Sequence, residues 1–125
     1  MSTPAGTQSI AKNRKAYFDY EIEEELEAGI MLKGTEVKSL RAGKVQLNDA
    51  YARIDGGEVF LAQLHIAEYD FGNLNNHEPL RVRKLLLNRN EIDRLARKVS
   101  EKGLTLIPLE LYFKNGKAKV KLGLC

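Results

Sequence analysis

The sequence predicts a mainly β domain, in which an antiparallel sheet closes into a small barrel and is accompanied by two helices. Two turn signals support this prediction, because residues 55–57 (Asp-Gly-Gly) and 115–116 (Asn-Gly) each separate two runs of strand-forming residues, as in a β-hairpin. A length of 125 residues with 43% hydrophobic content is typical of one globular domain. Closing the sheet would leave no exposed strand edge, which favours a barrel.

The N-terminus is expected to form a flexible arm. Residues 1–12 are rich in Ser, Thr, Gly and Ala and offer little to bury, which is typical of an unpacked segment. We therefore expect a single domain over residues 13–125.

The next segment fits two structures. Apolar and acidic residues alternate over 18–23, and apolar residues recur at every second position, out of phase, from Leu26 to Leu32, as in a half-buried strand with an irregularity near Glu24. A helix is the alternative, because every fourth residue from Phe18 to Ile30 is also apolar and glutamate favours helices. Periodicity alone does not decide between them.

The middle of the chain predicts a short helix, a hairpin and a loop. Val37 and Leu40 are three apart and Gly43 supplies a stop, which predicts a two-turn helix. Residues 45–54 and 58–64 flank the first hairpin turn. Residues 67–81 contain Gly, Asn and Pro without a sustained period, which indicates a long surface loop.

The C-terminal third predicts a strand, a helix and a second hairpin. Residues 84–87 (Lys-Leu-Leu-Leu) are expected to form a short buried strand, and the pair Asn88 and Glu91 forms a capping box for the helix that follows. The helix buries one apolar stripe and ends at Gly103. The second hairpin joins residues 104–113 to 117–124, with a bulge or edge position predicted at Pro108.

The small net charge of +3 hides a strong asymmetry. Residues 81–125 hold 12 lysines and arginines against 4 acids, whereas residues 1–80 hold 8 against 13. A basic third of this kind suits an anionic partner such as a nucleic acid, although an ordinary solvated surface is the alternative.

Metal, disulfide and nucleophilic chemistry are not expected. Cys125 is the single cysteine, only His65 and His77 accompany it, and the four serines lie in no nucleophile motif. We therefore expect no enzyme activity, no metal and no cofactor.

No membrane segment or secretory signal is expected either. The apolar runs fall far short of the ~20 residues that span a bilayer, and the first ten residues lack an apolar core. A cytoplasmic location is expected by default.

Several basic residues are candidates for contacting RNA. Lys117, Lys119 and Lys121 alternate with apolar residues, so their ammonium groups project from one face at a repeat of about 6.6 Å. Protection of a strand edge by lysine is the alternative interpretation. Further candidates are the basic cluster after the long loop, which includes Arg83 and Lys84, and the set Asn13, Arg14, Lys15 and Tyr17.

Glu27 is the one acidic candidate. A carboxylate beside Gly29 can accept a hydrogen bond from a base or a 2′-hydroxyl, and a solvated strand acid is the alternative. Glu23, Glu24 and Glu25 are adjacent, but nothing in the sequence supplies an apolar pocket that would let one act as an acid and another as a base.

Five stretches carry a specific resemblance, in order along the chain. They are residues 27–29 (Glu-Ala-Gly), 33–44 (Lys-Gly-Thr-Glu-Val-Lys-Ser-Leu-Arg-Ala-Gly-Lys), 76–79 (Asn-His-Glu-Pro), 83–87 (Arg-Lys-Leu-Leu-Leu) and 119–123 (Lys-Val-Lys-Leu-Gly). With them, the chain from Asn13 to Leu124 resembles the SmpB family, the SsrA-binding proteins of bacterial trans-translation.

The resemblance implies a fold and an activity. The fold would be a small antiparallel β-barrel of oligonucleotide-binding (OB) type with two or three flanking α-helices, and it favours strand for residues 18–32. The activity would be binding of the tRNA-like domain of transfer-messenger RNA at its elbow and its delivery to stalled ribosomes, without catalysis. RNA contacts would come from Asn13, Glu27, Leu86 and Lys119, although Leu86 could instead be a core residue.

The resemblance also implies partners. Elongation factor Tu and alanyl-tRNA synthetase would act on the acceptor end of the same RNA, and the protein itself is expected to be a monomer. Members of the family continue into a basic tail with a role at the ribosome, whereas this sequence ends at Cys125. The matched RNA contacts lie upstream of that tail, so RNA binding is expected to be independent of it.

Two other function classes compete with this one. A general single-strand binder would need aromatic stacking platforms, but only 7% of the residues are aromatic and Trp is absent. A ribosome-associated or protein-interaction module would instead expose a contiguous apolar patch.

Overall fold

The computed structural model describes residues 6–70 and 76–125. Within these residues the strands are β1 (Thr7–Lys12), β2 (Glu24–Ile30), β3 (Val45–Gln46), β4 (Tyr51–Asp55), β5 (Glu58–Ala62), β6 (His65–Ile66), β7 (Arg83–Leu86), β8 (Leu106–Lys114) and β9 (Lys117–Leu124). The helices are α1 (Arg14–Asp19), α2 (Gly34–Arg41) and α3 (Arg89–Lys102). The mainly β composition with flanking helices is confirmed.

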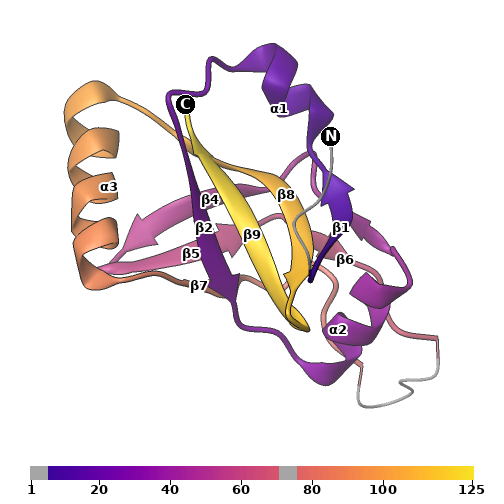
Figure 1. Cartoon of the computed structure of the whole chain (residues 1–125). Coiled ribbons are helices and arrows are strands. Elements are labelled where there is room, and N and C mark those ends of the chain that lie inside the picture. Colours follow the sequence, from indigo (N-terminus) through magenta and orange to yellow (C-terminus); the bar gives the residue numbers. More distant parts are fainter. Residues whose placement is uncertain (1–5, 71–75) are drawn as a thin grey trace.

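Six strands close into a barrel (Figure 1). Each strand in the order β8-β4-β5-β7-β2-β9 pairs with the next, and β9 pairs back with β8. All of these pairings are antiparallel. The predicted antiparallel barrel is therefore confirmed, and β3 and β6 form a separate two-stranded sheet.

The expected flexible arm is wrong for residues 7–12, which form β1. This strand pairs with β8 from Thr7 opposite Lys114 to Lys12 opposite Glu110. β4 pairs with β8 only at Leu106, so the rest of that edge of β8 is open to another strand. β1 pairs with this edge through backbone hydrogen bonds, which do not require apolar side chains. The polar composition of residues 7–12 therefore did not reveal the strand. Residues 1–5 lie outside the described residues.

The ambiguous segment contains both a helix and a strand. The strand predicted over residues 18–23 is wrong, because Phe18 ends up on α1 and is 90% exposed. The strand predicted further along is confirmed as β2, in which Ala28 and Ile30 are buried. Asn13 caps α1, so the helix starts before the alternating stretch and includes only its first two residues, 18 and 19.

The predicted turns and helices are confirmed with small changes. Gly43 ends α2 with φ +73°, and Gly103 ends α3 with φ +66°, the conformation that glycine adopts most easily. Asn115 and Gly116 both have positive φ in the β8–β9 turn, as a two-residue hairpin requires. Pro108 lies at a register shift in β8, as predicted.

The predicted strand 45–54 is divided into β3 and β4. The intervening residues 47–50 make a turn in which the Ala50 amide donates to the Leu47 carbonyl at 3.1 Å. This turn lets the chain leave the small β3–β6 sheet and enter the barrel.

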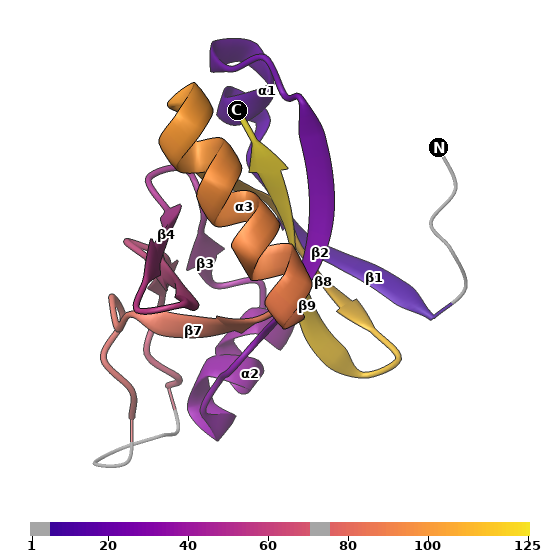
Figure 2. The ribbon, with the colours of Figure 1, turned by 90° about the vertical axis from the view of Figure 1, so that its left-hand side faces the viewer.

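Helices α2 and α3 both pack against the core of the barrel. Figure 2 shows α3 lying along the outside of the barrel and α2 near one end. Leu40 of α2 and Leu95 of α3 are buried in one cluster with Leu61 of β5 and Leu122 of β9. Burial of such side chains contributes about 1.5–3 kcal/mol each, so the core fixes both the strands and the helices.

A buried ion pair links α2 to β7. The Arg83 guanidinium donates through Nε to Glu36 Oε2 at 2.6 Å and through Nη1 to the Leu64 carbonyl at 2.6 Å, and both ionic side chains are fully buried. Arg81 donates to Glu36 Oε1 at 2.6 Å, and the Lys33 amide donates to the same oxygen at 2.8 Å. Burial alone would raise the pKa of Glu36, but these donors and the charge of Arg83 outweigh it and lower that pKa.

Breaking this pair should destabilise the fold. In Arg83→Met the Glu36 carboxylate stays buried with Arg81 as its remaining cationic partner, so we expect the free energy of unfolding to fall by about 3–5 kcal/mol. Denaturant unfolding would measure this loss. The neighbouring Lys84→Met is a matched control, because Lys84 forms an exposed pair with Glu58 at 3.0 Å, and it should change stability by less than about 0.5–1 kcal/mol. Equal effects of the two variants would contradict a structural role for the buried pair.

Candidate nucleic-acid interface

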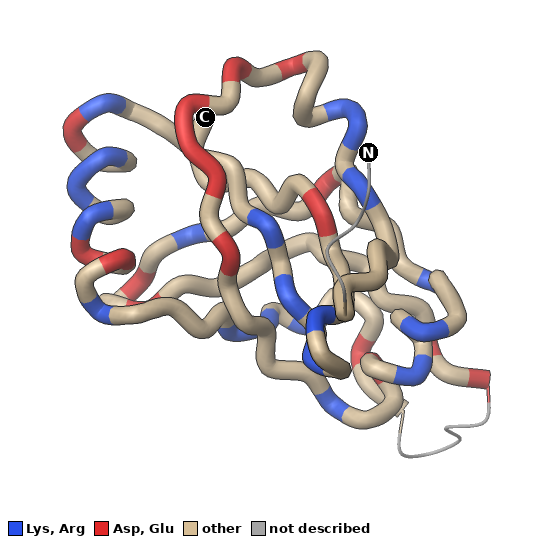
Figure 3. Tube along the Cα trace, viewed as in Figure 1, with Lys and Arg blue, Asp and Glu red and all other residues tan. Residues whose placement is uncertain are grey.

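The outer face of β2, β9 and β8 carries the lysine row predicted for the last strand. Val120 and Leu122 of β9 are buried, so Lys117, Lys119 and Lys121 project from the opposite side of the strand. Figure 3 shows these basic positions running along β9 beside the acidic start of β2. Because β9 is paired on both sides, its lysines lie in the middle of a sheet face and do not serve to protect an exposed edge.

Cross-strand pairing gives each lysine defined neighbours. Lys119 lies opposite Gly29 on β2 and Tyr112 on β8. Lys117 lies opposite Lys114 at the hairpin end. Two adjacent lysines at this end concentrate positive charge, which would attract phosphate groups.

Lys121 lies in a more mixed environment. It pairs with Glu27 on β2 and with Glu110 on β8, and its Nζ lies 3.8 Å from Glu110 Oε1. Lys121 therefore lies between two acidic neighbours, whereas Lys117 has a lysine as its cross-strand partner.

The Glu27 carboxylate is held in place on this face. The Tyr112 hydroxyl donates to Glu27 Oε2 at 2.5 Å, and Lys114 Nζ lies 3.5 Å from the same oxygen. The hydrogen bond from Tyr112 is the main cause of a lowered pKa for Glu27, burial opposes it, and the charges of Lys114 and Lys119 add to the lowering. Burial and the Glu27 carboxylate raise the pKa of Tyr112. Glu27 is therefore a fixed, charged acceptor rather than a freely solvated acid.

Leu86 extends the face onto β7. Its side chain is 50% exposed, while the preceding Leu85 is buried, so the core interpretation of Leu86 is wrong. Leu86 lies opposite Gly29, where an added Cβ would come within 3.2 Å of the Leu86 Cβ. The missing side chain at Gly29 leaves Leu86 room to lie against the β2 backbone beside Lys119. Lys84, on the same side of β7 as Leu86, forms the exposed pair with Glu58.

Two predicted contact residues are internal. Arg83 has no exposed surface and is bound to Glu36 and to two backbone carbonyls, so this burial does not favour an RNA contact, which stays a prediction. Asn13 is 2% exposed, and its burial likewise does not favour the predicted RNA contact, which stays a prediction. Both side chains stabilise the fold, a role that their polar character in the sequence did not reveal.

Arg14 and Lys15 lie exposed on α1, so they are accessible for the predicted RNA contact, which stays a prediction. Figure 1 places α1 near the C-terminal end of β9, away from the hairpin at which Lys117 begins the strand. These two residues therefore do not join the Lys114–Lys117 concentration of charge.

Sequence reasoning missed Tyr112 and Lys114. The Asn115-Gly116 turn contained the signal for both, because a two-residue hairpin pairs Lys114 with Lys117 and Tyr112 with Lys119. The contact between Tyr112 and Glu27 needed the pairing of β2 with β9, which no local pattern specifies.

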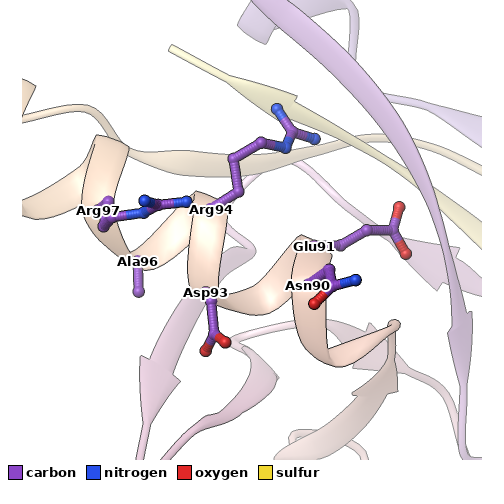
Figure 4. A pocket seen from close by; sticks show the side chains of 6 residues that line it. All are labelled: Asn90, Glu91, Asp93, Arg94, Ala96 and Arg97. Atoms are coloured by element: carbon purple, nitrogen blue, oxygen red, sulfur yellow. The ribbon is translucent and has the colours of Figure 1, made fainter.

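A second surface feature lies along α3. Figure 4 shows the side chains that line this depression, among them Glu91, Asp93, Arg94 and Arg97. Arg94 and Lys98 both bind Glu24 at the start of β2, so the charges here are mixed and partly paired. This feature does not share the positive character of the β9 face.

Within residues 6–70 and 76–125, no three His, Cys, Asp or Glu side chains gather as metal ligands would. Over the same residues, none of the helices has the length and apolar character needed to cross a membrane.

Comparisons with known proteins place the chain among SmpB proteins. A family profile described as "SmpB protein" matches residues 10–125. An SsrA-binding protein of Desulfitobacterium hafniense (strain DSM 10664 / DCB-2) is 60% identical over 120 residues, covering 96% of this chain and 77% of the relative. One from Geobacter metallireducens is 59% identical over 119 residues, covering 95% and 78%.

A solved structure is also similar. It is described as "tmRNA-SmpB: a journey to the center of the bacterial ribosome", and it matches with a TM-score of 0.76 and 55% sequence identity, covering 96% of this chain and 82% of that one.

The burial of Asn13 generates a stability prediction. Its Oδ1 accepts from the Ala16 amide at 3.1 Å and its Nδ2 donates to the Pro108 carbonyl at 3.2 Å. Asn13→Ala removes both bonds and should lower the free energy of unfolding by about 1–2 kcal/mol, as measured by denaturant unfolding. Asn13→Ser keeps a capping oxygen and should lose less. Lys12→Ala, at the exposed neighbour, is the control, and a loss there as large as in Asn13→Ala would contradict the capping role.

Proposed function

The chain belongs to the SmpB family, and we propose that it is an RNA-binding adaptor that binds the tRNA-like domain of transfer-messenger RNA and brings it to stalled ribosomes. The observation that carries this proposal is the lysine face of β9, in which a fixed carboxylate and an exposed leucine lie among the lysines. Lysines suit phosphates, the carboxylate suits a donor on a base or a 2′-hydroxyl, and the leucine suits an apolar base or ribose surface.

The combination favours a folded RNA over an unstructured strand. A single-strand binder places aromatic rings along its basic groove, whereas Tyr112, the aromatic residue on this face, is 6% exposed and bonded to Glu27. Of the exposed aromatic side chains, Tyr17, Phe18 and Tyr20 lie on or next to α1, and Tyr51 lies on β4. A carboxylate within a cationic face also repels phosphate unless it receives a specific donor, which favours selectivity over general affinity.

The proposed RNA-contacting residues are Glu27, Leu86, Lys117, Lys119 and Lys121, with Lys84, Arg14 and Lys15 at the margins. They belong to a single RNA-binding domain that begins at Asn13 and to which β1 adds a strand. The protein acts as a monomer in the cytoplasm and without catalysis. Elongation factor Tu and alanyl-tRNA synthetase act on the acceptor end of the same RNA, and the ribosome receives the assembled complex.

Salt dependence tests the electrostatic part of the proposal. Lysines that neutralise phosphates release counterions, so log K should fall linearly with log salt, with a slope of about −0.7 to −0.9 for each phosphate contacted. A gel-shift titration of the tRNA-like domain, with elongator tRNA and poly-U as competitors, would measure slope and selectivity together. An affinity that does not change with salt would exclude binding through the lysine face.

Lys119→Ala tests the central lysine. It should weaken binding to the tRNA-like domain by about 1 kcal/mol or more and leave the melting temperature nearly unchanged, because the side chain faces outward. Lys102→Ala, at the exposed end of α3, is the matched control and should keep full affinity. Val120→Asp, which buries a charge in the core, should unfold the domain. If Lys119→Ala lost stability and kept affinity, the two faces of β9 would be assigned the wrong way round.

Glu27→Gln separates a specific acceptor from a bystander acid. If Glu27 accepts a donor from the RNA elbow, the variant should lose about 1–3 kcal/mol of binding to the tRNA-like domain and none to poly-U. If it is a bystander near phosphates, binding should tighten slightly because a repulsion is removed. We expect the loss, and unchanged or tighter binding in a gel shift would exclude Glu27 from the site.

A further inference from the structure

We infer that Tyr112 is a positioning residue that sets the orientation of the Glu27 carboxylate and thereby the selectivity of the basic face. This inference rests on the proposed function, since it concerns how Glu27 meets the RNA. Its starting observation is the 2.5 Å hydrogen bond from the Tyr112 hydroxyl to Glu27 Oε2.

The bond reaches across a whole strand. Tyr112 belongs to β8 and Glu27 to β2, and β9 lies between these two strands. Tyr112 lies opposite Lys119, while Glu27 lies opposite Lys121. The Tyr112 side chain therefore crosses β9 diagonally, from the level of Lys119 to the level of Lys121.

This crossing matters because lysines surround the carboxylate. Lys121 is its direct cross-strand neighbour, Lys114 Nζ lies 3.5 Å from Oε2, and Lys119 contributes to the field that lowers its pKa. An unanchored glutamate could pair with any of these flexible ammonium groups, and such pairs hold no fixed geometry. Tyr112 is 6% exposed, and its strand is paired with β1 on one side and with β9 on the other, so its hydroxyl is a well-fixed donor.

As a consequence, one oxygen of the Glu27 carboxylate is already bound by Tyr112 and Lys114, and the other can accept a hydrogen bond from RNA. Both contacts described above use Oε2, which leaves Oε1 to accept from an RNA amine or hydroxyl. A preoriented acceptor does not have to be ordered when the RNA binds, which favours the matching donor over other RNA surfaces. Tyr112 itself is engaged with Glu27 and acts through that residue.

A double-mutant cycle tests this inference. Tyr112→Phe keeps the ring and removes only the hydroxyl, and we expect a roughly fivefold to tenfold loss of affinity for the tRNA-like domain with unchanged poly-U binding. In the Glu27→Gln background the same change should have less than about a twofold effect, because the acceptor that Tyr112 orients is already altered. Tyr51→Phe, on β4, is the matched hydroxyl-deletion control and should keep full affinity.

Each outcome decides the matter. A loss of equal size in both backgrounds would mean that Tyr112 acts independently of Glu27, and full affinity of Tyr112→Phe would mean that the hydrogen bond has no part in binding. Either result would overturn the inference while leaving the proposed function intact. A parent protein that does not prefer the tRNA-like domain over poly-U would instead overturn the proposed function. Thermal unfolding of every variant confirms that affinity is compared between folded proteins.

Discussion

Pairing of β9 with β2 on one side and with β8 on the other closes the barrel, and the candidate RNA-binding face takes its geometry from this pairing. The alternation of β9 sends Val120 and Leu122 into the core and the lysines outward. The same register sets Lys119 between Gly29 and Tyr112. Core packing and surface recognition are thus two consequences of one strand register, since a slip by one residue would exchange the two faces.

The buried pair Glu36 and Arg83, together with the partly exposed Arg81, performs a different task in the same fold. It connects α2 to β7 and, through the Leu64 and Pro79 carbonyls, to the chain on either side of the long loop. A buried charge is costly unless each of its donors and acceptors finds a partner, and here the carboxylate receives donors from two arginines and a backbone amide. Such a cluster defines the position of α2 more narrowly than apolar packing alone, because hydrogen bonds are directional.

Under the proposed function, a carboxylate among lysines changes which RNAs the candidate face can distinguish. Lysines alone attract any phosphate backbone, and their attraction contains no information about shape or sequence. Glu27 introduces a local penalty that only a suitably placed donor removes. A folded RNA offers such a donor at a fixed position relative to its phosphates, whereas an unstructured strand does not. The face therefore combines general attraction with one test of geometry.

Local sequence patterns were sufficient for the hairpins, for α2 and α3, and for the outward row of lysines, because each depends on residues close together in the chain: the Asn115-Gly116 turn, the Asn88–Glu91 capping box, and the period of two in β9. The residues themselves also predicted a closed barrel and singled out Glu27, and the resemblance to a known family added the OB type and Leu86 as a contact candidate. Neither the local patterns nor the resemblance could show that β1 is a strand. β1 pairs with the free edge of β8, and that edge exists only because strands distant in sequence form the barrel. Only the tertiary structure showed which polar residues are buried. Arg83 and Asn13, which the sequence analysis treated as surface candidates, lie in the interior. The tertiary structure also decided that Tyr112 reaches Glu27 across β9, because a contact between residues 85 positions apart exists only once the barrel has closed.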